Sequence, residues 1–93
     1  MFTVKFMPKA VDDLRGIAAF IAQDNPVRAL SFISEIEERT SKALALTPKA
    51  GTVYKGNTRY FPVRGYVALY EVNEVRQVVN VLHVVSSRMD WKK

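Results

Sequence analysis

Arginines in the second half of the chain are the side chains best suited to bind a charged group. Arg59, Arg64 and Arg88 lie near the starts or ends of segments with strand-like patterns, so they could converge in space although they are distant in sequence. Converging guanidinium groups would hold a phosphate or a carboxylate through paired hydrogen bonds. The alternative is a set of solvated surface charges, with Arg64 serving the turn before Gly65.

His83 is the only histidine and the one candidate for a proton donor. It lies at every second position with Val79, Val81 and Val85, which indicates a place on an apolar strand. A lone histidine in such a strand is usually a hydrogen-bonded structural residue. The functional alternative is a general acid or a polar contact near the end of the strand.

Templates for most other chemistry are absent from the sequence. It has no glycine-rich phosphate loop, no histidine pair at metal-ligand spacing and no Gly-x-Ser-x-Gly turn. The lack of cysteine excludes disulfides and thiolate chemistry, and it fits a reducing cytoplasm. No signal peptide begins the chain, and no apolar stretch reaches the ~18 residues that span a bilayer. We therefore expect a cytoplasmic protein without metal, cofactor or membrane contact.

The positive charge of the chain is concentrated in its second half. Residues 1–47 contain six acidic and six basic residues, whereas residues 48–93 contain three acidic and eight basic residues. Such a field favours nucleic acid or an acidic protein as the partner. The alternative is that the basic surface binds no anionic molecule in particular.

Aromatic residues accompany these charges. Tyr66 and Tyr70 share one face of a predicted strand, with Tyr60 nearby. They could stack nucleic-acid bases, although packing in the core explains at least two of the three. The basic tail after residue 85 carries Trp91, the only tryptophan, and either contacts a partner or folds back on the domain.

A strand and two helices are predicted to position these side chains. Alternating apolar residues predict a strand over residues 2–6, and Pro8 favours a helix start near residue 8. Asn25 and Pro26 favour a second helix that ends near residue 46, and the short connection predicts an antiparallel hairpin. The core-facing stripe of this second helix comprises Leu30, Ile33, Ile36, Thr40, Ala43 and Leu44.

The remaining residues predict a loop followed by three strands. The loop covers residues 47–58, and the strands cover about residues 59–63, 66–72 and 76–85. A tight turn at Asn73-Glu74 would join the last two strands, of which the final one is apolar on both faces and so central. Pro62 places the first of the three at an edge or ends it early.

The element order is strand, helix, helix, strand, strand, strand. This order predicts an α+β fold, with an antiparallel helical hairpin packed on a small, mostly antiparallel sheet. With 93 residues, the chain has too little apolar surface for two cores, so residues 1–93 form a single domain.

Several motifs follow one another in an order that covers nearly the whole chain. The first half carries the segment from Ala10 to Ile21, Asp24-Asn25-Pro26, and Leu46-Thr47-Pro48 with Gly51. The second half carries the segment from Gly65 to Val72, and Val81-Leu82-His83-Val84 with Arg88. No single motif is specific, but the ordered set resembles the RelE/ParE superfamily of bacterial toxins, and its ParE branch in particular.

The resemblance implies the toxin of a type II toxin–antitoxin module, of the kind that stabilises plasmids and arrests growth. It implies a cognate antitoxin whose carboxy-terminal segment wraps the toxin. Operator DNA would be contacted only through the DNA-binding domain of that antitoxin. The basic second half agrees with an acidic, partly disordered partner.

Two activities are known in the superfamily: ParE-like members inhibit DNA gyrase by binding, and RelE-like members cut messenger RNA on the ribosome. An endoribonuclease needs a base for the 2′-hydroxyl, an acid for the leaving oxygen and cations for the charged phosphorane. In this chain the catalytic candidates would be Arg59, Arg64, His83 and Arg88.

The sequence favours the gyrase inhibitor, which is not an enzyme. RelE-like nucleases commonly carry a tyrosine or histidine in the last segment, but here no tyrosine follows Tyr70, and Trp91 cannot usefully exchange protons. The Asp24-Asn25-Pro26 motif also looks closer to ParE. The resemblance implies these target-binding candidates: Lys49, Lys55, Arg59, Arg64, Arg88 and Trp91.

Overall fold

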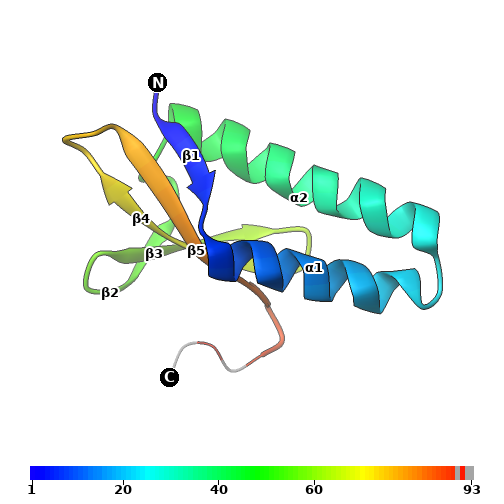
Figure 1. Cartoon of the computed structure of the whole chain (residues 1–93). Coiled ribbons are helices and arrows are strands. Elements are labelled where there is room, and N and C mark those ends of the chain that lie inside the picture. Colours follow the sequence, from blue (N-terminus) through cyan, green and yellow to red (C-terminus); the bar gives the residue numbers. More distant parts are fainter. Residues whose placement is uncertain (90, 92–93) are drawn as a thin grey trace.

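A strand and a helical hairpin form the first half of the chain in the computed structural model, which describes residues 1–89 and 91. Strand β1 (Thr3–Phe6) leads into α1 (Pro8–Ala22), and α2 (Pro26–Leu46) runs back antiparallel to α1 (Figure 1). The predicted strand, both helices and the hairpin are confirmed. Within the described residues, neither helix is long and apolar enough to cross a membrane.

Local chemistry sets the ends of the helices. A proline occupies the first turn of each helix, where the missing N–H would have no helical partner. Asn25 caps α2 as predicted, because its Oδ1 accepts a hydrogen bond from Arg28 N at 3.0 Å. Thr47 leaves the helical conformation with φ −133°, as expected for a residue that precedes a proline.

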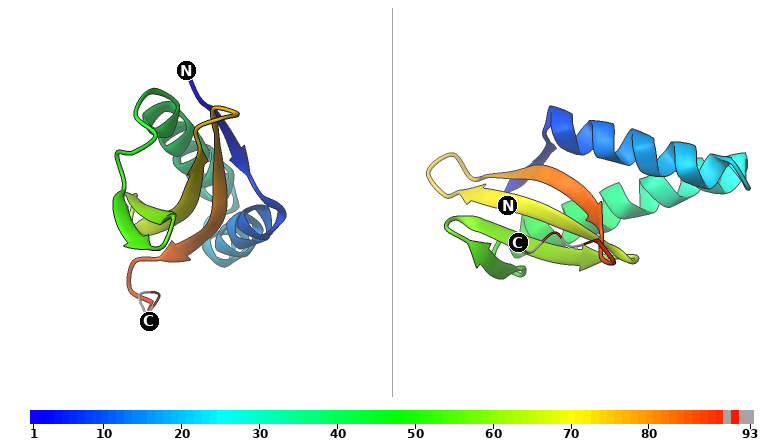
Figure 2. Two further views of the ribbon diagram at one scale, coloured as in Figure 1. Left: turned by 90° about the vertical axis from the view of Figure 1, so that its left-hand side faces the viewer. Right: turned by 90° about the horizontal axis from the view of Figure 1, so that it is seen from below.

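In the described part of the chain, the second half supplies four strands of a five-stranded sheet. They are β2 (Thr52–Lys55), β3 (Thr58–Val63), β4 (Tyr66–Asn73) and β5 (Val78–Ser86). The strand order is β1-β5-β4-β3-β2, with β1 parallel to β5 and the other pairs antiparallel. Both helices lie on one face of the sheet (Figure 2), so the predicted α+β fold is confirmed.

The loop predicted over residues 47–58 is wrong for its second half, which contains β2. This edge strand pairs with β3 through a register that shifts between Val53 and Lys55. Three of the four residues of β2 are exposed in the structure. A strand without a buried face does not need alternating apolar residues, and this sequence signal is therefore absent. The strand conformation of β2 depends on pairing with β3, which a local pattern does not reveal.

The other strands follow the predictions closely. β5 lies between β1 and β4, as its two apolar faces predicted. The prediction that Pro62 places its strand at an edge or ends it early is wrong, because β3 lies between β4 and β2 and continues to Val63. Pro62 is tolerated there because it lies beyond the part of β3 that pairs with β2, so its missing N–H leaves no partner unpaired on that side. The tight turn predicted at Asn73-Glu74 is wrong: the turn covers residues 74–77, and Asn73 Oδ1 stabilises it by accepting a hydrogen bond from Arg76 N at 3.0 Å.

Side chains from the helices, β3, β4 and β5 fill the core between the hairpin and the sheet. Leu30 was predicted to face this core, but 75% of its surface is exposed. The reason is that the buried face of α2 begins at Ala29 and continues through Ile36, Thr40 and Leu44, and Leu30 lies beside this face. At its far end the hairpin extends past the sheet (Figure 1). The largest side chains that are fully buried are Tyr70, Ile36, Leu44, Val79, Val81 and Thr40.

Gly51 joins the end of α2 to the sheet at a close approach. Its N–H donates a buried hydrogen bond of 2.8 Å to the hydroxyl of Tyr70 on β4. A Cβ atom at this position would lie 2.5 Å from both Tyr60 O and Tyr70 Oη. Only glycine therefore fits here without a shift of the surrounding backbone.

We predict that Gly51→Ala lowers the free energy of unfolding by about 2–4 kcal/mol, because the added Cβ overpacks the contact and disturbs a buried hydrogen bond. Gly16→Ala is the matched control, since no atom lies within 4 Å of a Cβ at this helical position. It should raise the free energy of unfolding by about 0.5–1 kcal/mol. Urea denaturation followed by far-UV circular dichroism measures both; equal stability of the two variants would contradict the prediction.

Candidate functional site

Arg59 on β3 fixes the segment between α2 and β2 to the sheet. Its Nη1 donates to Gly51 O at 2.8 Å and to Lys49 O at 3.4 Å. The N–H of the same residue, Gly51, donates to the hydroxyl of Tyr70. Burial raises the pKa of the Tyr70 hydroxyl above its ordinary value of 10.0, an effect that the hydrogen bond from Gly51 partly opposes. The Nη1 side of the Arg59 guanidinium therefore holds the backbone in place.

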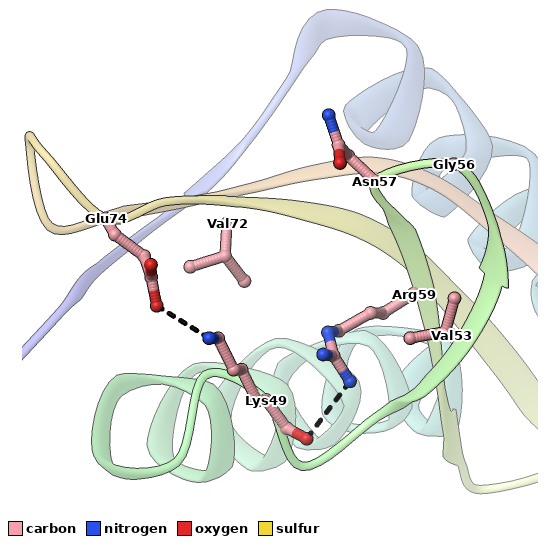
Figure 3. A pocket seen from close by; sticks show the side chains of 7 residues that line it. All are labelled: Lys49, Val53, Gly56, Asn57, Arg59, Val72 and Glu74. Atoms are coloured by element: carbon pink, nitrogen blue, oxygen red, sulfur yellow. Dashed lines mark hydrogen bonds and ion pairs between the residues drawn. The ribbon is translucent and has the colours of Figure 1, made fainter.

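Lys49 closes a small pocket beside Arg59. Its Nζ lies 2.8 Å from Glu74 Oε1, in the turn between β4 and β5. The hydrogen bond from Lys49, followed by the lysine charge, lowers the pKa of Glu74 below its ordinary value. The pocket has a volume of about 250 Å³ and is shown in Figure 3. It is lined by Lys49, Val53, Gly56, Asn57, Arg59, Val72 and Glu74.

Arg64 lies at the opposite end of β3, in the turn that leads to β4. Its guanidinium carbon is 5.7 Å from the centre of the Phe32 ring, and its Nη2 is 3.9 Å from Glu35 Oε1. Arg28 lies over the same ring at 5.3 Å, and its Nη1 is 2.6 Å from Glu35 Oε2. The hydrogen bond from Arg28 lowers the pKa of Glu35 despite an opposing effect of desolvation. Residues of α2 thus hold Arg64 in place.

The tail after β5 contacts the turn between β3 and β4. Ser87 donates from its N–H and from its hydroxyl to Gly65 O, at 3.1 and 2.8 Å. The adjacent Arg88 is exposed, and its backbone N–H donates to Ser86 Oγ at 3.2 Å. Arg64 and Arg88 therefore lie close to the same turn, next to the start of the tail.

Trp91 folds back onto the sheet. Its ring meets those of Tyr54 on β2 and Tyr60 on β3 edge to face, with centroid distances of 5.5 and 4.9 Å. The hydroxyl of Tyr54 donates to Trp91 O at 3.0 Å. Of the three tyrosines predicted to stack bases or pack in the core, Tyr66 and Tyr70 pack with the core on the helical side.

His83 on β5 pairs with a carboxylate of α1. Its Nδ1 lies 3.2 Å from Asp13 Oδ2, and this oxygen also accepts a hydrogen bond from Val84 N at 3.0 Å. β1 pairs with β5 only as far as Val81, so Asp13 satisfies a backbone donor that β1 does not reach. The hydrogen bond to Asp13 favours the structural alternative for His83. Its predicted alternation with Val79 and Val81 is wrong, because a register shift between β4 and β5 puts Val84 on their buried face and leaves His83 exposed.

The candidate residues form two groups. Lys49, Lys55 and Arg59 lie towards the end of the sheet that carries the β4–β5 turn, whereas Arg64 and Arg88 lie at the other end. Arg59 and Arg64 are five residues apart along an extended segment, which corresponds to about 16 Å. His83 lies two strands from Arg59, or about 10 Å. The four residues that a nuclease would need are not gathered around one point.

Three carboxylates that organise the site were missed in the sequence. Asp13, Glu35 and Glu74 each hold a basic side chain that is distant in sequence. No local pattern marks such pairs, because they depend on how the hairpin is laid on the sheet. Within the described residues, no three imidazole or carboxylate groups gather as metal ligands.

Comparisons with known proteins agree on one fold. Residues 4–91 match the family model of the ParE toxin of the type II toxin–antitoxin system parDE. A structure of the chromosomal ParDE toxin–antitoxin system from P. aeruginosa matches with a TM-score of 0.77 and 21% identity, over 92% of this chain and 96% of that chain. No curated protein sequence gives a significant match.

Two further structures share the fold. The RelBE2 toxin–antitoxin complex from Mycobacterium tuberculosis matches with a TM-score of 0.73 and 21% identity, over 95% of this chain and 93% of that chain. The isolated RelE toxin from E. coli matches with a TM-score of 0.63 and 17% identity, over 98% and 89% respectively. At these identities the structural likeness concerns the fold alone.

We predict that Tyr70→Phe lowers the free energy of unfolding by about 1–3 kcal/mol, because the buried N–H of Gly51 loses its acceptor. Since the folded pKa of Tyr70 lies above the unfolded value of 10.0, the contribution of its protonated hydroxyl is complete below pH 10 and is lost as the pH rises through the folded pKa. Urea unfolding at pH 8 and above pH 10 should therefore show a steeper alkaline loss in the unsubstituted protein. An equal loss in both proteins would contradict this role of Tyr70.

Proposed function

The chain belongs to the ParE toxin family of type II toxin–antitoxin systems, and we propose that it acts by binding DNA gyrase and inhibiting it without catalysis. Its place of action would be the cytoplasm. The observation that carries the proposal is that Arg59, Arg64 and His83 are each held by a different partner, respectively Gly51 O, Glu35 and Asp13. Their backbone positions are about 10 to 16 Å apart along and across the strands. A phosphodiester in its transition state needs such groups within hydrogen-bond distance.

Binding needs a different arrangement, which this surface supports. Cations at both ends of the sheet can contact an extended protein surface at separate points, and their field speeds encounter with an acidic one. Lys55 and Arg88 are exposed, and Lys49 and Arg64 retain exposed side chains despite their ion pairs. We assign these four side chains to contacts with the target.

Arg59 and Trp91 also hold the segments that carry these four side chains. Arg59 holds the backbone at Lys49 and Gly51, and Trp91 anchors the tail that begins with Arg88. Fixed side chains lose less conformational entropy on binding, so this support contributes to affinity.

The partner that neutralises the toxin would be a cognate acidic antitoxin. The end of the helical hairpin exposes three large apolar side chains, Phe20, Val27 and Leu30, at 69%, 81% and 75%. Phe20 also lines a groove of about 420 Å³ between α1 and the carboxy-terminal end of β5, together with Ile17 and Val84. Exposed apolar surface of this kind favours a partner segment that covers it. The ParDE and RelBE2 structures of the same fold are toxin–antitoxin systems, which supports such a partner.

We predict that the purified protein inhibits supercoiling by DNA gyrase and leaves translation and messenger RNA intact. Arg64→Ala and Arg88→Ala should each raise the concentration needed for half-inhibition by about twofold to fivefold, because each removes an exposed charged contact. Arg15→Ala is the control, since Arg15 is an exposed arginine of α1 whose ion pair with Asp12 is local. Cleavage of ribosome-bound messenger RNA with unaffected supercoiling would refute the gyrase proposal.

We further predict that the acidic protein encoded next to the toxin gene restores growth when both are expressed together. Phe20→Ser should remain toxic but escape this rescue, because the antitoxin segment loses an apolar contact. Val75→Ser is the control, since Val75 is 96% exposed in the β4–β5 turn, away from the hairpin end. Growth counts on plates decide the outcome; equal rescue of both variants would exclude the hairpin end from the interface.

A further inference from the structure

We propose that the pocket formed by Lys49, Arg59 and Glu74 binds one carboxylate side chain of the toxin's protein target. The inference deepens the proposed function and rests on it, because it gives the gyrase contact a chemical form. It assigns the recognised group to an aspartate or glutamate that enters between the α2–β2 segment and the β4–β5 turn.

The guanidinium of Arg59 has one edge in use and one edge open. Its Nη1 donates to Gly51 O and Lys49 O. In the described part of the chain, Nε and Nη2 have no hydrogen-bond acceptor, and Figure 3 shows them on the pocket side of the group. These two nitrogens form the fork that holds a carboxylate through two parallel hydrogen bonds. The backbone contacts fix the direction of the fork.

The ion pair with Glu74 shows that Lys49 can bind a carboxylate in the pocket. The carboxylate of Glu74 lies 2.8 Å from Lys49 Nζ, and 63% of the Glu74 side chain is exposed, so it can swing away from the lysine. A carboxylate from the target would replace Glu74 at Lys49 and meet Arg59 at the same time. Glu74 is then an internal competitor that lowers affinity for any other anion.

The pocket suits a carboxylate better than the backbone of a nucleic acid. Val53 and Val72 form apolar walls for the methylene groups of an acidic side chain, and Asn57 adds an amide. A strand of phosphates would bring several negative charges beside Glu74, whereas one carboxylate brings a single charge. The aromatic rings of Tyr60 and Trp91, which could stack bases, pack against each other, and neither ring lines the pocket.

The first test is an NMR titration with sodium acetate, which is a carboxylate without any attached protein. The Nε–H resonance of Arg59 should shift saturably with acetate and should not shift with sodium chloride at the same ionic strength. The apparent affinity should fall up to about fivefold in Lys49→Gln and rise by about twofold to fivefold in Glu74→Gln. An Arg59 resonance that ignores acetate, or a site that prefers inorganic phosphate, would overturn the assignment to a carboxylate.

The second test uses gyrase supercoiling and a control pair with the same charges. Lys42 and Glu38 form an exposed ion pair of 3.2 Å on α2, outside the pocket. Lys49→Gln should weaken inhibition and Glu74→Gln should strengthen it, whereas Lys42→Gln and Glu38→Gln should leave it unchanged. Because the charge changes are identical, equal effects of the two pairs would refute a specific pocket.

The two tests separate the inference from the function on which it rests. Failure of the unsubstituted protein to inhibit gyrase, with acetate still bound at Arg59, would overturn the choice of target and leave the carboxylate pocket supported. Inhibition of gyrase that does not depend on Lys49 or Glu74 would support the target and overturn the pocket. Thermal melts of all four variants identify any loss that comes from unfolding.

Discussion

Gly51 is held through both its N–H and its carbonyl, and the arrangement of the candidate site depends on these two hydrogen bonds. Its N–H donates to Tyr70, and its carbonyl accepts from Arg59, so one residue joins β3, β4 and the segment after α2. A side chain at this position would collide with the backbone of Tyr60 and with the ring of Tyr70. The absence of a Cβ at Gly51 thus allows the hairpin and the sheet to meet closely enough to form a pocket.

Several basic side chains in the second half of the chain are held by other residues, which the composition alone does not indicate. Arg59 stabilises a backbone turn, Arg64 stacks on Phe32 beside Glu35, and Lys49 pairs with Glu74. These contacts leave part of each charge exposed while restricting where the side chain can point. A charge count therefore describes the long-range field of this protein, and the acidic partners from other elements determine which groups can recognise a ligand.

The sequence predicted the elements whose signals are local. Proline and asparagine at the helix starts, alternation in the strands and apolar residues on both faces of β5 were sufficient for the α+β fold. The sequence did not predict β2, whose strand conformation comes from pairing with β3. It also did not predict the exposure of Leu30, because the buried face of α2 includes the small Ala29 in its place. The sequence also could not predict which cations lie together, because their grouping depends on the register of β3 and on ion pairs between residues distant in sequence.

Trp91, which lies in the tail, is the only tryptophan of the chain. It packs against Tyr54 on β2 and Tyr60 on β3, outside the core. Its intrinsic fluorescence consequently reports where the tail lies and carries no direct signal from the interior of the domain. Nearby tyrosines can also transfer excitation energy to it while the rings remain together. Emission from this one indole therefore offers a spectroscopic means to watch the tail leave the sheet while the helices stay folded.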